Sequence, residues 1–357
     1  MATQAFRRQN LSDERLELIA KARDVLDEYD GAKLTARQLY YQFIARDLFP
    51  ASWIDEEYHA EHELPPDTKN TTKNYQRFTV LITDARYAGL IDWEAIEDRG
   101  REPILPLEFR DLDHRVDAAL ANYRLPRWAD QPAHAELWVE KQALAGVLAP
   151  LAHEFHVPLM VNKGYSSASA MYESAQRMRD AQGLTGEWYA SWSARCDNDD
   201  ELADAAENDP ELHKALQKKY VDEFIAHTKP VHVFYLGDHD PSGEDMVRDI
   251  GRRLKEFGVK RLNVEKLALT MDQIRRFNPP PNPAKLSDSR AKAYIAKYGR
   301  QSWEVDALPP RELQRIIRRA LASVVDVDKM RAVMVREDAD KAKLRDAFER
   351  TKKGGRK

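Results

Sequence analysis

The sequence predicts an α/β fold in which a helical N-terminal domain precedes a mainly parallel sheet and a helical C-terminal part. Up to about residue 110, apolar residues recur at the three- and four-residue spacing of helices. From about residue 133, short runs of apolar and β-branched residues alternate with amphipathic segments. Strands that alternate with helices form largely parallel sheets with helices on their faces.

Length and composition suggest two domains, since the chain has 357 residues, of which 43% are hydrophobic, and a formal net charge of −4. The single cysteine, Cys196, excludes a disulfide framework and a thiolate zinc site. No apolar run approaches the roughly 18 residues that a membrane helix needs. The N-terminal segment does not resemble a secretory signal either. We therefore expect a soluble, cytoplasmic protein.

The N-terminal domain is predicted to span 1–110 and to contain three helices. Ser12 caps a helix over 11–30, Thr35 caps the segment ARQLYYQFIARDLF, and a third helix covers 72–88. A charged, hairpin-like tip follows, which is the layout of a winged-helix domain whose third helix faces nucleic acid. A solvated helix face explains each basic residue there equally well. The candidate nucleic-acid ligands are Lys73, Arg77, Arg86, Arg99 and Arg101.

A linker over 111–132 leads to a second domain over 133–330, with strand candidates AELWVE, VPLMVNKG, PVHVFYLG and RLNVEKLAL. An acidic insertion over about 182–226 interrupts it. Its segment CDNDDELADAAENDPE lacks the glycine that a calcium loop needs, so we expect a solvated acidic loop leading into a helix. Residues 331–357 are predicted to form a basic tail, helical or disordered.

Three carboxylates follow strands of the predicted sheet. Asp238 and Asp240 end the third strand, and their spacing turns both side chains to one side of an extended chain. Glu140 ends the first strand. Ligands bind beyond the carboxyl ends of parallel strands, and three carboxylate oxygens suit Mg²⁺ or Mn²⁺, which would relieve their repulsion. The alternative is that the aspartates serve only as turn and helix-capping residues.

These motifs resemble those of a known family. The glutamate at one strand end and GDHDPSG at another look like the Toprim domain, particularly that of the topoisomerase VI A subunit and the meiotic double-strand-break transesterase. The resemblance implies that Glu140, Asp238 and Asp240 hold Mg²⁺, with Glu140 also catalytic. It places Lys163, in VNKGYSSASA, near the site. SWEVDAL, which contains Glu304, is similar to a further stretch of that family.

The same family carries a nucleophilic tyrosine in a winged-helix domain before the Toprim domain, in a motif like T-x-R-D-I-Y-Y. LTARQLYYQFIARDLF is similar, although Gln38 stands where the family has an acid. The helical period puts Tyr40 in the apolar stripe and leaves Tyr41 exposed, one turn after Arg37. An exposed phenol beside a guanidinium suits attack on a phosphodiester, so Tyr41 and Arg37 are the expected catalytic pair.

The sequence therefore predicts a Mg²⁺-dependent enzyme, similar to the topoisomerase VI A subunit, that cleaves double-stranded DNA through a covalent phosphotyrosine. Two alternatives stay open: a Toprim nuclease that cuts with metal-activated water, and a DNA-binding scaffold without activity. Cutting both strands with one tyrosine per chain requires a homodimer, in which Tyr41 would face the partner's carboxylates. Strand passage would also require a separate ATPase subunit, because we recognise no nucleotide-binding motif.

Overall fold

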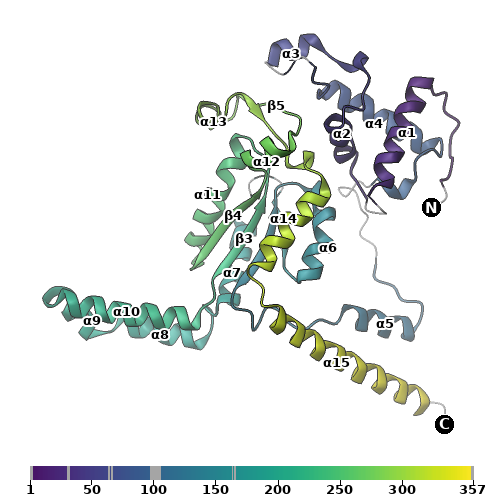
Figure 1. Cartoon of the computed structure of the whole chain (residues 1–357). Coiled ribbons are helices and arrows are strands. Elements are labelled where there is room, and N and C mark those ends of the chain that lie inside the picture. The colour runs from purple at the N-terminus through teal and green to yellow at the C-terminus, as the bar shows by residue number, and fades with distance from the viewer. Residues whose placement is uncertain are drawn as a thin grey trace.

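The computed structural model describes residues 3–29, 33–62, 65, 67–96, 106–162, 164 and 166–354. A helical N-terminal region sits on one end of an α/β region, and two helical projections leave the other end (Figure 1). The predicted α/β class is confirmed, because a parallel sheet follows the N-terminal helices and carries helices on both faces.

Capping residues and an aromatic core explain the helices of the N-terminal region. The hydroxyls of Ser12 and Thr35 accept hydrogen bonds from the backbone N–H groups of Arg15 and Gln38, at 3.4 and 3.2 Å. The Gln38 side chain accepts in return from the Thr35 N–H at 2.9 Å, which gives glutamine a structural role at that position. Aromatic side chains fill the core between the helices. The helices are α1 (Asp13–Asp27), α2 (Ala36–Ala45), α3 (Glu56–His62) and α4 (Thr72–Tyr87).

Four parallel strands form the main sheet, in the order β2-β1-β3-β4. They correspond to the four strands predicted from the sequence. Val139 at the end of β1 lies opposite Leu236 at the end of β3, so the residues after both strands emerge at the same edge. The strands are β1 (His134–Val139), β2 (Leu159–Val161), β3 (Val231–Leu236) and β4 (Leu262–Ala268).

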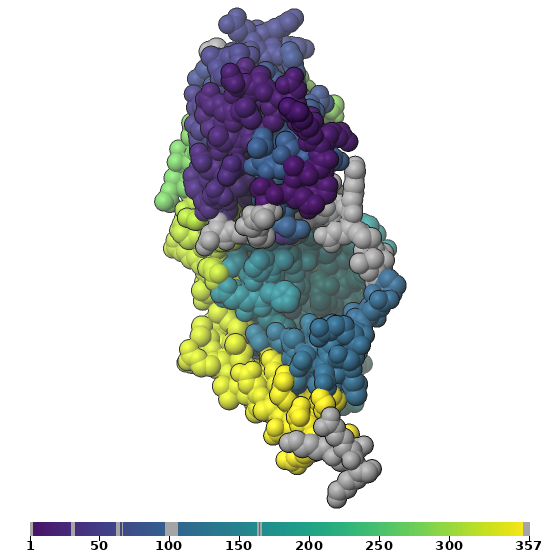
Figure 2. All heavy atoms as spheres, turned by 90° about the vertical axis from the view of Figure 1, so that its right-hand side faces the viewer, coloured from purple at the N-terminus to yellow at the C-terminus, as the bar shows by residue number. Residues whose placement is uncertain are grey.

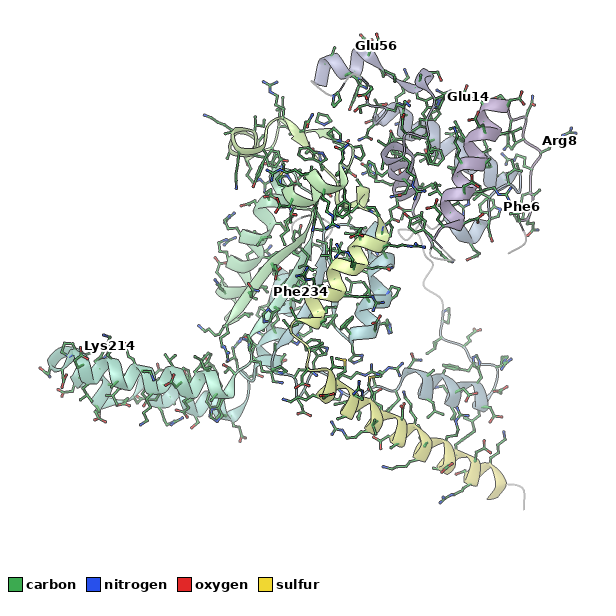
Figure 3. The ribbon with its side chains drawn as sticks, viewed as in Figure 1. Phe6, Arg8, Glu14, Glu56, Lys214 and Phe234 are labelled. Atoms are coloured by element: carbon green, nitrogen blue, oxygen red, sulfur yellow. The ribbon has the colours of Figure 1, made fainter. Side chains whose placement is uncertain are left out.

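Helices cover both faces of this sheet. On one face, α6 (Ala145–Phe155) and α14 (Pro310–Ala322) pack over an apolar core that contains Phe234 (Figure 3). On the other, α7 (Ala168–Gln182) and α11 (Pro241–Glu256) cover a second cluster of buried side chains. The strands are therefore buried on both sides, as their continuous apolar runs indicate.

A segment after β4 folds over the carboxyl ends of the strands. Its two short strands pair in an antiparallel manner on either side of a helix, and we call residues 282–302 the cap segment. A 3₁₀ helix follows the cap segment and leads into α14. The elements are α12 (Met271–Phe277), β5 (Asn282–Pro283), α13 (Ala291–Tyr298), β6 (Gln301–Ser302) and the 3₁₀ helix Val305–Ala307.

Three helices form an arm that projects from the α/β region, with Lys214 on its surface (Figure 3). The prediction of an acidic loop is wrong, because the aspartates of this segment cap helices. Asp199 and Asp209 accept hydrogen bonds from the N–H groups of Leu202 and Leu212, at 2.9 and 3.1 Å. Acidic side chains at a helix N-terminus also favour the helix dipole. The arm consists of α8 (Glu187–Asp197), α9 (Asp200–Asn208) and α10 (Pro210–His227).

The second projection contains α5 (Leu112–Asn122), within the predicted linker, and α15 (Val327–Gly354). The two helices lie side by side, joined by ion pairs (Figure 2). At its base, Arg127 makes a buried pair with Glu337 at 2.7 Å. Of the two alternatives for the tail, the helix is observed through Gly354. In the described part of the chain, no helix is long and apolar enough to cross a membrane.

Candidate active site

The structure brings Glu140 and Asp238 together at the carboxyl edge of the sheet, because β1 and β3 are neighbours. Oε2 of Glu140 accepts hydrogen bonds from the backbone N–H of Asp238 at 3.0 Å and from the Tyr235 hydroxyl at 3.2 Å. Burial, and then the charge of Asp238, raise the pKa of Glu140 above its usual value. The carboxylates at this edge therefore repel each other, as their spacing in the sequence indicates.

Asp240 lies beside them and caps α11. Its Oδ1 accepts from the Gly243 N–H at 2.6 Å and from the Ser242 hydroxyl at 2.9 Å. A Cβ at Gly243 would lie 2.2 Å from the carbonyl oxygen of Asp238, so only glycine fits this turn. Proline at the first turn and glycine at the close approach thus explain the DPSG sequence after the strand.

The Asp238 carboxylate pairs with a lysine that the sequence analysis missed. Nζ of Lys141 lies 2.8 Å from Oδ2 of Asp238, 3.1 Å from Oε2 of Glu304 and 3.9 Å from Oδ1 of Asp306. Burial opposes its charge, but the three carboxylates together raise the pKa of Lys141. The signal was available in the sequence, since Lys141 directly follows Glu140 at the strand end.

Glu304 and Asp306 enter the site from the 3₁₀ helix after the cap segment, whose Val305 N–H donates to Oδ1 of Asp238 at 2.9 Å. Arg37 of α2 donates to both oxygens of Glu304, at 2.9 and 3.2 Å. Although burial opposes it, Lys141 and then Arg37 lower the pKa of Glu304. Asp306 is 1% exposed, and burial raises its pKa to about 6.

The prediction that Tyr41 lies on an exposed helix face is wrong, since only 3% of the residue is exposed. Glu304 and Asn282, the latter at the start of the cap segment, lie close enough to this face of α2 to affect the pKa of the Tyr41 phenol, and both line the same cavity as Tyr41. Burial, and then the charge of Glu304, raise the pKa of the Tyr41 phenol. Tyr40 is buried as predicted, and its hydroxyl accepts from the Thr71 N–H at 3.2 Å.

Tyr41 nevertheless shares a cavity with the carboxylates of its own chain. This cavity of about 320 Å³ lies between α2, the start of α4, the cap segment and the end of β3. Asp238, Asp240, Arg37 and Glu304 line it together with Tyr41. The remaining lining residues are Tyr40, Tyr58, Asn70, Thr71, Thr72, Tyr75, Asn282, Pro283, Lys285, Ser302 and Trp303.

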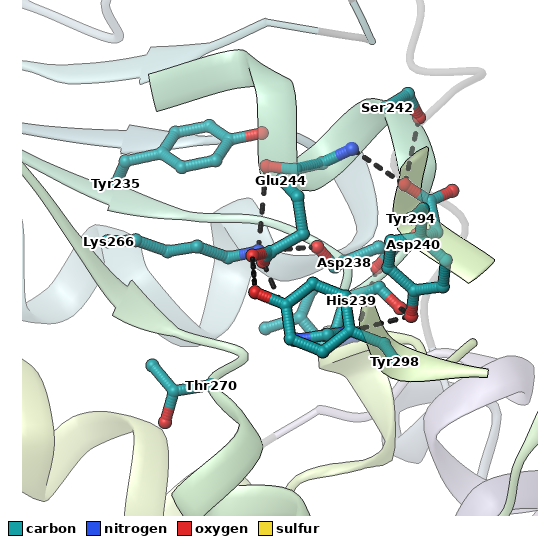
Figure 4. Close-up of polar contacts among 12 residues, drawn as sticks. Tyr235, Asp238, His239, Asp240, Ser242, Glu244, Lys266, Thr270, Tyr294 and Tyr298 are labelled. Carbon is teal, nitrogen blue, oxygen red and sulfur yellow. Dashed lines mark hydrogen bonds and ion pairs between the residues drawn. The ribbon is translucent and has the colours of Figure 1, made fainter. Parts of the chain in front are cut away.

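Behind the carboxylates, a buried polar network fixes the turn after β3 (Figure 4). Lys266 donates to the carbonyl oxygen of Asp238 at 2.7 Å and to Oε1 of Glu244 at 2.7 Å. The His239 ring lies 2.9 Å from the Tyr294 hydroxyl, and burial lowers the pKa of His239, so its imidazole is neutral at pH 7. These groups position the site without lining the cavity.

The predicted nucleic-acid ligands of the N-terminal region differ in their roles. Lys73 is exposed, 3.7 Å from Asp55, and Arg77 lies over the ring of Trp53. Arg86 is structural: its guanidinium lies over the Trp93 ring and donates to the Trp93 carbonyl at 2.9 Å. It also donates to the Ile96 carbonyl at 3.3 Å, so the Arg86 side chain is engaged within the N-terminal region. The predicted residues Arg99, Arg101 and Lys163 lie outside the described residues.

The cap segment carries basic residues that the sequence analysis did not select. Lys285 and Lys292 are exposed and form no ion pair within the described part of the chain. Lys285 lines the cavity. Lys297 is also exposed and lies over the Tyr298 ring. The cap segment therefore carries exposed positive charge, of which Lys285 lies at the acidic cavity.

The residues present fit a divalent ion only in part. Among the residues that the structure describes, no three His, Cys, Asp or Glu side chains are arranged to hold a metal ion. Mg²⁺, however, needs only one or two carboxylates when water and phosphate complete its shell. Among the described residues, Lys141 and Arg37 lie next to this group of five carboxylates and Lys285 also lines the cavity, so the carboxylates outnumber the basic side chains. The five are Glu140, Asp238, Asp240, Glu304 and Asp306.

Comparisons with protein-family models, with curated proteins and with solved structures found no match to this chain. Its function must therefore be argued from the site.

Proposed function

We propose that the protein is a Mg²⁺-dependent enzyme that cleaves phosphodiester bonds in DNA, with Tyr41 as its nucleophile. One observation carries the proposal: Tyr41, Asp238 and Asp240 line the same cavity. The motifs that resemble the topoisomerase VI A subunit support the same chemistry.

The groups around Tyr41 support its role as a nucleophile. A nucleophilic hydroxyl requires a base within hydrogen-bond reach and a third group that orients the base. Glu304 lines the same cavity as Tyr41 and affects the pKa of its phenol, and Arg37 and Lys141 hold Glu304 in place. A phosphate that binds Arg37 would draw the guanidinium from Glu304, so the pKa of Glu304 would rise and the carboxylate would become a stronger base.

The proposed step is a transesterification. The Tyr41 oxygen bonds to phosphorus as its proton passes to Glu304, and the bond from phosphorus to one sugar oxygen breaks. That oxygen takes up a proton and leaves as a sugar hydroxyl, so no oxidant or reductant is required. Glu140 and Asp240 would hold a Mg²⁺ ion, which when bound stabilises the negative charge on the phosphoryl oxygens.

The surroundings of the cavity support a nucleic-acid substrate. The N-terminus of α4, at Thr71 and Thr72, lines the cavity, and helix N-termini favour phosphate. Lys285 and Lys292 of the cap segment are available to neighbouring phosphates of the backbone. Lys73 follows Thr72 on α4 and is exposed, 3.7 Å from Asp55.

The burial of Tyr41 favours one alternative, in which metal-activated water attacks and the tyrosine only packs. Incubation of supercoiled DNA with Mg²⁺ or Mn²⁺, with and without protease before the gel, separates the two. Transesterification gives cut DNA that enters the gel only after protease digestion, and Tyr41→Phe abolishes it. Tyr172→Phe, on the exposed surface of α7, is the matched control and should retain activity. Free ends that persist in Tyr41→Phe would establish the hydrolytic nuclease, and binding without cutting would contradict both.

A further inference from the structure

The tyrosine and the carboxylates of the candidate active site belong to one chain, although a homodimer with shared sites was expected from the sequence. We infer that each chain holds a complete cleavage site and cuts one DNA strand by itself. This inference rests on the proposed function, because it concerns the same chemistry. It predicts a nick in one strand as the primary product.

The contact between the N-terminal region and the α/β region is a packed core. Ala307, from the 3₁₀ helix before α14, is 3% exposed and belongs to the apolar cluster that contains Leu39 of α2. Tyr41 belongs to the same buried cluster. An apolar residue from one region inside the core of the other indicates a permanent interface rather than a transient one.

Polar groups complete the interface and come from three separate places. Arg37 pairs with both oxygens of Glu304. Nδ2 of Asn70, before α4, donates to Oδ1 of Asn282 at 2.9 Å and to the carbonyl oxygen of Pro281, just before the cap segment, at 3.1 Å. Arg311 of α14 donates to a carbonyl after α1 at 2.6 Å. Each contact joins the region of Tyr41 to the region of the carboxylates in the same chain.

A shared site would require these contacts to break. Tyr41 could reach a partner's carboxylates only by leaving Glu304 and Asn282, and Arg37 would lose its carboxylate. Asp306, which is 1% exposed with both oxygens lacking a hydrogen-bond partner in the described part of the chain, would be opened to water. The closed arrangement instead leaves one cavity in which all the reacting groups of a single chain meet.

The decisive experiment combines two inactive chains. Tyr41→Phe and Asp238→Asn chains, each with a different affinity tag, are expressed together, and the hybrid is purified through both tags. If sites were shared between chains, each hybrid dimer would keep one intact site of two, so nicking would reach about half of the wild-type rate. We expect no nicking above the level of either variant alone. A monomeric wild type whose nicking rate is proportional to its concentration would support the inference equally.

A second measurement does not depend on activity. In a Cys196→Ser background, Asn70→Cys and Asn282→Cys are treated with a short bifunctional maleimide. We expect a cross-link within one chain, which keeps monomer mobility in denaturing gels and yields one linked peptide pair. Asn70→Cys with Lys214→Cys, on the distant arm, is the control and should not react in this way.

The outcomes distinguish a failure of the single-chain site from a failure of the proposed function. Active hybrids, or a cross-linked dimer as the main product, would overturn the single-chain site and leave the proposed function intact. A wild type that forms no phosphotyrosine would overturn the proposed function, and the inference about strand cutting would fall with it.

Discussion

Replacing Lys141 with methionine tests whether this lysine neutralises the carboxylate cluster. Methionine keeps most of the side-chain length and removes the charge. The ammonium lies 2.8, 3.1 and 3.9 Å from the carboxylates of Asp238, Glu304 and Asp306. At an effective dielectric constant of about 20, each pair attracts by about 4–6 kcal/mol before desolvation is counted.

The net loss of stability is smaller than that sum. Removing one partner of a buried ion pair costs about 3–5 kcal/mol in the free energy of unfolding, because uncompensated charge remains. Proton uptake by the carboxylates limits the loss. A carboxylate of usual pKa can be neutralised at pH 7.5 at a cost of about 5 kcal/mol, so its uncompensated charge cannot cost more than that. We therefore expect Lys141→Met to lose about 3–5 kcal/mol at pH 7.5.

The pH dependence gives the sign of the effect. A carboxyl whose pKa is raised on folding binds its proton more tightly in the folded state, so folding is favoured as the pH falls through that raised pKa. In Lys141→Met the raised pKa values of Asp238 and Asp306 rise further. The deficit relative to wild type should shrink by about 1.4 kcal/mol per pH unit for each extra proton bound, between pH 7.5 and about 5.

Urea denaturation of both proteins at pH 7.5, 6.5 and 5.5, without divalent ions, measures these differences. Lys218→Met, on the exposed arm, is the matched control and should change stability by less than about 0.5 kcal/mol. A Lys141→Met variant as stable as wild type at pH 7.5 would refute the neutralising role. A deficit of constant size across the pH range would show that packing, and not charge, was lost.

Three further predictions concern the DNA surface and the turn after β3. Lys285→Glu with Lys292→Glu should weaken DNA binding and lower the slope of log affinity against log salt concentration by about 2. Reversing the charge of Lys214, on the arm, should change neither quantity. An unchanged slope in the double variant would show that the cap segment does not contact DNA. Arg86→Gln should cost about 1–3 kcal/mol in thermal or urea unfolding and leave the DNA affinity of the folded protein unchanged. Gly243→Ala should cost about 1–3 kcal/mol because its Cβ meets the carbonyl of Asp238, and an unaltered melting temperature would contradict that clash.

The sheet was predictable because its information is local. Apolar runs such as AELWVE and PVHVFYLG identify buried strands, and their alternation with helices fixes parallel pairing. The proximity of Glu140 and Asp238 was also predictable, because the carboxyl ends of neighbouring parallel strands lie at the same edge of the sheet. The arm was mispredicted because Asp199 and Asp209 were interpreted as loop residues, whereas the same residue type caps helices.

The errors at Tyr41 and Lys141 have a different cause. A helical wheel describes one helix, and the face that it assigned to solvent is covered by Glu304 and Asn282, more than 200 residues later. Lys141 was overlooked because a lysine after a strand usually faces water. No local pattern shows that Asp238 and Glu304 converge on it, since that depends on how the cap segment folds back.

The positions of the charges suggest how one site can hold both a lysine and a divalent ion. Lys141 serves the buried end, where it lies beside Glu304 and Asp306, and its raised pKa keeps it protonated. Asp240 lines the cavity, and Glu140 uses its Oε2 for the hydrogen bonds that fix the strand end. A lysine cannot leave with the product, so the buried end stays neutralised throughout a reaction cycle. In the proposed reaction an exchangeable ion would be needed only where the substrate phosphate arrives, because the phosphate would add negative charge to a cluster that already has an excess of it.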